Sequence, residues 1–211
     1  MTVAPPPVAA YALLALPDRG ATPMAETDAA QSDTALPLFR QLARNNSLAN
    51  HRLHGACARL SEAEYRAERP CFFRTIHATL NHILFVDQRY LERLEGGSPA
   101  PVEGDIELFA EREALAAAQA ESDRRLLGFV EGLGAADLAR PIRYVCWSHD
   151  WTENPISAVL LHLFLHQTHH RGQVHDLLSQ TTVAPPQLDE FLLAEDVALR
   201  ADEMAALGLR A

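Results

Sequence analysis

Apolar residues recur every three or four positions along four long, separate stretches of the sequence. This period gathers apolar side chains on one face of an α-helix. It predicts helices over about 36–60, 72–95, 106–133 and 154–179, and a further amphipathic helix over 188–207. Long helices joined by modest links bury their apolar faces against one another. The sequence therefore predicts an all-α fold, a four-helix bundle with an additional C-terminal helix.

The longest link inside this core lies between the third and fourth bundle helices. Residues 140–152 within it carry β-branched and aromatic side chains, which suit a short hairpin or an extended crossover. Ser61 and Glu64 match a capping box that could open a short helical turn. Residues 1–33 show no sustained period. We expect a flexible or loosely docked N-terminal extension over 1–33 and a helical bundle domain over 34–211, with a long crossover between its third and fourth helices.

The charge of the chain argues against two classes of partner. It carries 28 acidic residues against 18 basic ones, and its net charge is −10. Nucleic acids and anionic membranes need a concentrated basic face, so neither is an expected partner. The sequence contains no lysine, which excludes Schiff-base chemistry and a phosphate-binding Walker lysine. Three widely spaced cysteines, an odd number, predict a reducing, cytoplasmic location.

Ten histidines remain to be explained, and five of them lie between His162 and His175. His166 and His170 are four residues apart, so on a helix they lie about 40° from each other and one turn apart. They share the apolar face of the fourth helix, which should turn both imidazoles inward. His175 falls roughly opposite His166 and should lie outward. The spacing of His166 and His170 lets both imidazoles bind one metal ion.

A transition-metal site needs a third protein ligand, because two imidazoles do not complete one. The second helix offers His77 and His82, and only His82 lies along the apolar side of that helix. We therefore predict a metal site made of His82, His166 and His170. The histidines expected beside the site, without ligating, are His162 and His169. We expect surface or structural positions for the other five histidines, which are at 51, 54, 77, 149 and 175.

Three neutral imidazoles without a thiolate or carboxylate leave a bound divalent ion with an open coordination position. A water there would be acidified toward a pKa of about 7, and a thiol there would lose its proton. Zinc is the expected ion, with nickel or iron as alternatives. No E-x-x-H, H-E-x-x-H or G-x-S-x-G motif occurs, which excludes a ferritin-like di-iron site, a zincin and an α/β-hydrolase. No carboxylate is placed by the sequence as a general acid or base.

Two motifs resemble those of a known family. They are T-L-N-H-I-L over 79–84 and H-Q-T-H-H-R-G-Q over 166–173. With them, the stretch from about 36 to 195 resembles the DinB family. The resemblance implies a four-helix bundle, often dimeric, whose metal is held by one histidine of the second helix and two of the last bundle helix. By position these are His82, His166 and His170.

The resemblance also implies a range of functions, because the wider superfamily includes thiol-dependent transferases and isomerases and proteins of proposed hydrolase type. We expect metal-assisted hydrolysis or thiol-dependent transfer on an unknown small molecule, with a low-molecular-weight thiol as a candidate partner and a homodimer as the assembly. The alternative is a non-enzymatic stress-response or binding module with a structural metal, and a metal-free bundle of mutually bonded histidines is a third interpretation. Within the second motif, Arg171 and Gln173 are expected to hold local hydrogen bonds, and Gly172 to permit close helix packing.

Overall fold

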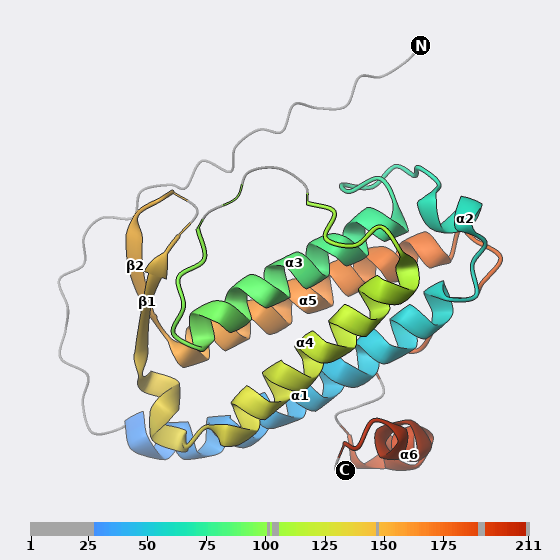
Figure 1. The fold of residues 1–211 in the computed structure, drawn as a ribbon. Coiled ribbons are helices and arrows are strands. Elements are labelled where there is room, and N and C mark those ends of the chain that lie inside the picture. The colour runs from blue at the N-terminus through green and yellow to red at the C-terminus, as the bar shows by residue number, and fades with distance from the viewer. Residues whose placement is uncertain (1–27, 101, 103–105, 147, 190–192, 210–211) are drawn as a thin grey trace.

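Four long helices packed side by side form the body of the molecule (Figure 1). The computed structural model describes residues 28–100, 102, 106–146, 148–189 and 193–209. The bundle helices are α1 (Asp28–Cys57), α3 (Ile76–Leu94), α4 (Arg112–Gly132) and α5 (Ile156–Leu178). The shorter elements are α2 (Glu62–Arg66), α6 (Val197–Ala206), two 3₁₀ helices (Ala135–Ala139 and Ala194–Asp196) and the strands β1 (Pro141–Val145) and β2 (Trp151–Pro155). The predicted all-α fold is confirmed.

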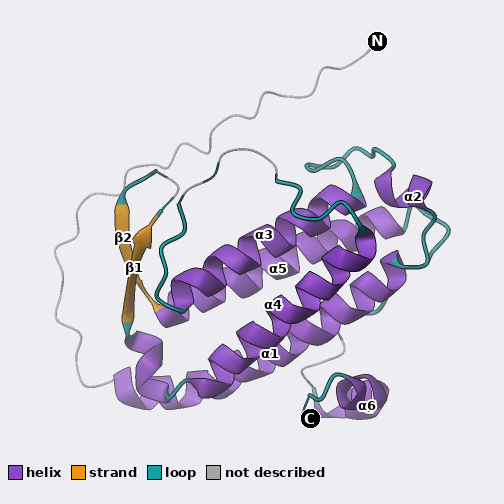
Figure 2. Cartoon of the chain, in the orientation of Figure 1, coloured by secondary structure: helices purple, strands orange, loops and turns teal. Residues whose placement is uncertain are grey.

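The two strands of the described residues are confined to the link between α4 and α5 (Figure 2). They pair antiparallel, with Ile142 opposite Asn154 and Tyr144 opposite Thr152. Ile142 and Tyr144 are both buried, because alternate residues of a strand point to the same side and here that side faces the bundle. The link predicted over 140–152 is therefore a hairpin that closes one end of the core.

The directions of the helices determine which link must return along the bundle. α1 pairs with α4, and α3 with α5, in antiparallel fashion, whereas α3 and α4 run parallel (Figure 1). Contacts between α3 and α4 ascend along both helices, from Asp87 with Gln119 to Glu95 with Arg125. The connection from α3 to α4, the second and third bundle helices, therefore crosses back to the end of the bundle where α3 begins. The long link predicted as a crossover between the third and fourth bundle helices, α4 and α5, instead contains the hairpin at one end of the core.

The ends of the helices differ from the sequence prediction. α1 begins at Asp28, so it overlaps the predicted N-terminal extension, while residues 1–27 lie outside the described residues. α6 begins at Val197 rather than near 188. The predicted capping box is confirmed at the start of α2, where the Ser61 hydroxyl accepts the backbone N–H of Glu64 and the Glu64 carboxylate accepts the backbone N–H of Ser61.

α4 begins later than predicted, at Arg112 rather than near 106. The backbone N–H groups of Leu108 and Phe109 donate to the side-chain oxygen of Asn81, at 2.9 and 3.0 Å. The side-chain nitrogen of Asn81 donates in turn to the carbonyl of Phe109. Because these backbone groups are satisfied by a side chain of α3, the segment before Arg112 forms a turn against α3 instead of a first helical turn.

Buried polar residues separate two apolar clusters along the length of the bundle. On α1 the first cluster ends at Ala43 and the second begins at Leu53; on α5 the first ends at Phe164 and the second begins at Val174. Between the clusters every bundle helix contributes buried polar side chains. We call this set the polar layer; its members are Asn46 and Asn50 of α1, Asp87 of α3, Gln119 and Asp123 of α4, and Gln167 and Arg171 of α5.

The two carboxylates of the polar layer share amide donors. Gln119 donates from its side-chain nitrogen to Asp87, at 2.7 Å, and to Asp123, at 3.2 Å. Asp123 also accepts from the side chains of Asn46 and Asn50, at 3.1 and 2.9 Å. Burial raises the pKa of both carboxyls to about 7, because the low-dielectric interior disfavours their charged forms.

Arg171 supplies the positive charge of the polar layer. Its guanidinium donates to the side-chain oxygens of Asn46, Asn50 and Gln167, and the Gln167 amide donates to Asp87. Burial lowers the pKa of Arg171 to about 10, while the two nearby carboxyls act in the opposite direction. The arginine therefore stays protonated near pH 7 and is linked to both carboxylates through side-chain amides.

The raised pKa of Asp123 predicts a pH-dependent stability. Its folded-state pKa of about 7 exceeds the ordinary value of about 3.9, so between these values the folded state binds more protons than the unfolded state. This carboxyl therefore costs stability as pH rises through that window. We expect Asp123→Asn to gain more than about 1 kcal/mol relative to wild type between pH 5 and pH 8, measured by urea denaturation.

Asp202→Asn is the control for this prediction, because Asp202 lies exposed on α6. Its difference from wild type should be the same at both pH values. An Asp123→Asn difference that is equally independent of pH would contradict the assignment of a raised pKa to the buried carboxyl.

α6 packs on the outside of α1. Met204 forms a small apolar cluster with Leu48 and Ala49, and Glu203 forms an ion pair with Arg52. Within the described part of the chain, no helix combines the length and apolar character needed to cross a membrane.

Candidate metal centre

Three histidines converge in the groove between α3 and α5. His82 lies in the second turn of α3, and His166 and His170 lie one turn apart on α5. One ring nitrogen from each lies within 4.8 Å of the others. The Nε2 atoms of His82 and His166 are 3.1 Å apart, and the centroids of the His166 and His170 rings are 4.3 Å apart. The structure thus brings together the three residues predicted as ligands.

The protonation state of the three histidines favours binding of a cation over hydrogen bonds among the rings. Burial, followed by the charges of neighbouring histidines, lowers the pKa of His82 to about 4 and that of His166 to about 2. Burial also lowers the pKa of His170. All three rings are therefore neutral near pH 7, and each keeps one nitrogen lone pair. In addition, Nδ1 of His166 is buried without a hydrogen-bond partner. A cluster of nitrogen lone pairs fits a transition-metal ion.

Gln173 determines which nitrogen of His170 is free. Nδ1 of His170 lies 2.7 Å from Oε1 of Gln173, and an amide oxygen can only accept, so His170 donates from Nδ1. Its Nε2 then carries the lone pair. Orientation of a ligating histidine by a hydrogen bond to its other nitrogen is a common feature of metal sites. The local hydrogen bonds expected of Gln173 are confirmed.

The two histidines expected beside the site lie close to it but outside the cluster. His169 is exposed, packs edge-on against the His170 ring at 4.8 Å, and accepts from the amide nitrogen of Gln173 at 3.2 Å. His162 is also exposed, and it stacks on Tyr90 at 5.2 Å. Neither provides a nitrogen to the group of three.

Phe73 covers the cluster and was not identified from the sequence. Its ring stacks on His82 with centroids 4.2 Å apart and lies 5.5 Å from the His170 ring. Phe73 is buried, whereas the preceding Phe72 is 69% exposed. Arg74 follows this pair with a left-handed backbone, φ of 66°, and the next residue, Thr75, caps α3. The turn therefore folds Phe73 back over the first turns of α3.

A cavity of about 180 Å³ lies beside His82. Its walls are formed by Phe73, Ala78, Asn81, His82, Ile106 and Glu107. The Asn81 hydrogen bonds described above hold Leu108 and Phe109 against α3. They thereby also position Ile106 and Glu107, which directly precede Leu108 and form part of the cavity wall. The cavity is smaller than the roughly 300 Å³ typical of sites for drug-sized ligands, so it suits a short molecule.

The remaining residues of the second motif divide into two kinds. Arg171 holds the hydrogen bonds expected of it, although they lie in the polar layer and not on the surface. The expected packing role of Gly172 is wrong. A Cβ built on Gly172 meets no atom within 4 Å, because this side of α5 faces solvent.

Gly172→Ala is therefore expected to raise the free energy of unfolding by about 0.5–1 kcal/mol, since glycine in a helix interior is less stable than alanine by that amount. Chemical denaturation measures it. Gly96→Ala should have the opposite effect, because Gly96 adopts a left-handed φ of 95° that alanine disfavours. A loss of stability in Gly172→Ala would restore the packing interpretation.

Comparison with known proteins supports the same architecture. Residues 30–203 match the profile of the DinB family. No curated protein matches the chain. Among solved structures, the chain is similar to a DinB-like protein from Bacillus cereus ATCC 10987, with 18% identity and a TM-score of 0.51 over 66% of this chain and 89% of that one. The structural similarity concerns the fold, while the family match spans most of the sequence, and the chain therefore belongs to the DinB family.

Proposed function

We propose that His82, His166 and His170 bind one divalent metal ion, with zinc as the expected ion and nickel or iron as alternatives. The observation that carries the proposal is the convergence of three neutral ring nitrogens within 4.8 Å beside a cavity. Zinc is commonly held by three imidazoles in sites that keep a coordination position open. The donor set, all nitrogen and all neutral, suits each of these metals.

We propose further that the centre serves metal-assisted hydrolysis or thiol-dependent transfer on a small molecule. When bound, a divalent ion would supply a Lewis acid that promotes deprotonation of water or a thiol near neutral pH. The chain's own residues orient and shield the site: Gln173 fixes the His170 ring, and Phe73 covers His82.

The cavity favours an enzyme over the alternative of a non-enzymatic stress-response or binding module with a structural metal. Structural metal sites are closed by protein ligands, whereas catalytic sites leave room for a reactant. Here His82 forms part of a cavity wall, so a small molecule that enters the cavity can approach the histidine cluster.

Metal analysis tests the site. Protein purified without a nickel column should contain about one divalent ion per chain, as expected for a single site of this kind. His82→Ala and His166→Ala should remove it, while His162→Ala and His169→Ala should retain it because these histidines lie outside the cluster. Equal metal content in wild type and in the first two variants, measured by mass spectrometry, would refute the site.

The partners belong to the same proposal. They are a small-molecule substrate, with a low-molecular-weight thiol as the candidate, and a second copy of the chain in a cytoplasmic homodimer, with neither nucleic acid nor membrane as a partner. Light scattering of the purified protein tests the dimer, and a monomer at micromolar concentration would contradict it.

A further inference from the structure

Glu107 brings a carboxylate to the cavity that also exposes His82. Among the lining residues that the structure describes, Glu107 is the one acidic residue, and none is an arginine. Its side chain is 54% exposed, so it is accessible to a ligand. Glu107 was not selected from the sequence, because it falls at the start of the helix predicted over 106–133, whereas the structure places it in the link before α4.

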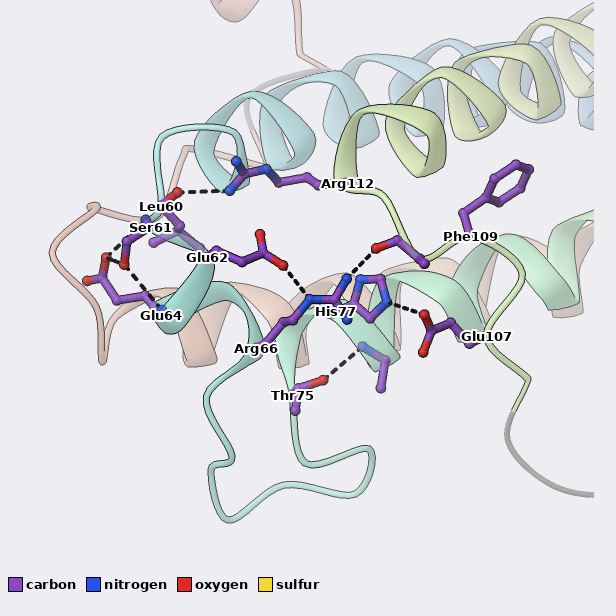
Figure 3. A network of polar contacts seen from close by, with 12 residues as sticks. Leu60, Ser61, Glu62, Glu64, Arg66, Thr75, His77, Glu107, Phe109 and Arg112 are labelled. Carbon is purple, nitrogen blue, oxygen red and sulfur yellow. Dashed lines mark hydrogen bonds and ion pairs between the residues drawn. The ribbon is translucent and has the colours of Figure 1, made fainter.

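His77 lies beside this carboxylate. Nε2 of His77 lies 3.4 Å from Oε1 of Glu107 (Figure 3). The His77 ring is buried and packs edge-on against Tyr65, with centroids 5.3 Å apart. Burial, and then the charge of Arg66, lowers the pKa of His77. Nε2 of His77 also lies 3.2 Å from the side-chain nitrogen of Asn81. Glu107 therefore lies against a neutral imidazole, which does not cancel its negative charge.

The cation next to this pair is engaged elsewhere. Arg66 lies beside His77 in Figure 3, but its guanidinium forms an ion pair with Glu62 and donates to the carbonyl of Ala110. In the part of the chain that the structure describes, no arginine forms an ion pair with Glu107. The charge of Arg66 still acts on Glu107 without direct contact, so within the described part of the chain the carboxylate is not paired with an arginine.

The side chain of Asn81 is already hydrogen-bonded within the protein, which leaves Glu107 as the polar group available to a ligand. The side-chain nitrogen of Asn81 donates to the carbonyls of His77 and Phe109, and its oxygen accepts two backbone N–H groups. Both ends of the amide are thus used within the protein. The other walls, apart from His82, are apolar. A ligand in this cavity meets one carboxylate, apolar surface and His82 of the histidine cluster.

We propose that the ligand of this site is a small molecule with a positively charged amine, which pairs with Glu107 while its reacting group reaches the histidine cluster. A short amino thiol combines the two requirements, because a thiol suits the metal centre and an ammonium suits Glu107. The inference rests on the proposed metal site and specifies the charge of its substrate.

Three thiols of similar size and different charge test this proposal. They are 2-aminoethanethiol, which is cationic, 2-mercaptoethanol, which is neutral, and mercaptoacetate, which is anionic. Binding to cobalt-loaded protein is followed by the absorption of the thiolate-to-cobalt transition. Because each thiol has its own acidity, the quantity compared is the change in affinity of each thiol from wild type to Glu107→Gln.

Glu107→Gln should weaken binding of 2-aminoethanethiol about three- to fivefold, the range expected for a partly exposed ion pair. Binding of 2-mercaptoethanol should stay unchanged, and mercaptoacetate should bind more tightly. Glu121→Gln is the matched control, since Glu121 is 52% exposed and does not line the cavity. It should change none of the three affinities.

Two outcomes would overturn the inference in distinguishable ways. Equal changes for the three thiols, or none, with cobalt still bound would refute the charge preference and leave the metal site intact. Wild-type protein that does not bind cobalt, or whose cobalt binding survives His82→Ala and His166→Ala, would refute the proposed site and the inference with it.

Discussion

Replacing Arg171 by methionine is expected to lower the free energy of unfolding by about 3–5 kcal/mol, the cost of removing one partner from a buried charged group. Methionine preserves much of the apolar volume of the side chain but supplies no donor. The amide oxygens of Asn46, Asn50 and Gln167 would lose the guanidinium, and Asp87 and Asp123 would remain buried with no positive charge nearby. The change therefore affects all four bundle helices.

Urea denaturation in the presence of a chelator measures this effect, because Arg171 follows His170 directly and the chelator removes any contribution of bound metal. Arg124→Met is the matched control. Arg124 is 68% exposed and pairs with Glu121 on the surface of α4, where such a pair contributes about 0–1 kcal/mol. Equal losses for the two variants would show that the polar layer contributes little to stability.

The second large effect is that of His166→Leu on stability, and its sign differs between metal-free and zinc-bound protein. In a chelator, His166→Leu is expected to stabilise the fold by about 1–3 kcal/mol, because wild type buries an Nδ1 atom without a partner and leucine removes it. In zinc at 100 times its dissociation constant, wild type should gain about 2.7 kcal/mol, and the variant should gain nothing. The order of stability of the two proteins should therefore reverse.

Thermal unfolding with chelator and with zinc provides the measurement. His162→Leu serves as control, because His162 lies outside the cluster and should leave the gain from zinc intact. A His166→Leu variant that is less stable than wild type in chelator would favour the metal-free interpretation, in which the imidazole is a satisfied part of the core.

The sequence predicted the helices and the histidine cluster because both depend on a period of 3.6 residues. Apolar stripes reveal which face of a helix is buried, and the same geometry places His166 and His170 one turn apart on α5. The family resemblance agreed with the choice of His82. The ends of the helices were less well predicted; the start of α4, for example, depends on hydrogen bonds from Asn81, which is 27 residues before Leu108.

The residues missed by the sequence analysis reach the site through contacts between distant segments. Phe73 and Glu107 fall at the starts of the helices predicted over 72–95 and 106–133, but the structure places both in links. They reach the site through a turn before α3 and through the Asn81 hydrogen bonds. Asp87 lies on a helix, but its role depends on side chains from α4 and α5. Such contacts between distant segments could not be derived from spacing along the chain.

The polar layer also fixes the axial register of α5 against its neighbours. Gln167 and Arg171 each follow a candidate ligand by one residue, so hydrogen bonds in the core determine the height of His166 and His170 along the bundle. A slip of α5 by one turn would move it by about 5.4 Å, more than the 4.8 Å within which the three ring nitrogens lie. Depending on its direction, such a slip would also move either Arg171 or Gln167 out of the polar layer toward an apolar cluster. The same slip that would disperse the metal ligands thus carries a large energetic penalty in the core.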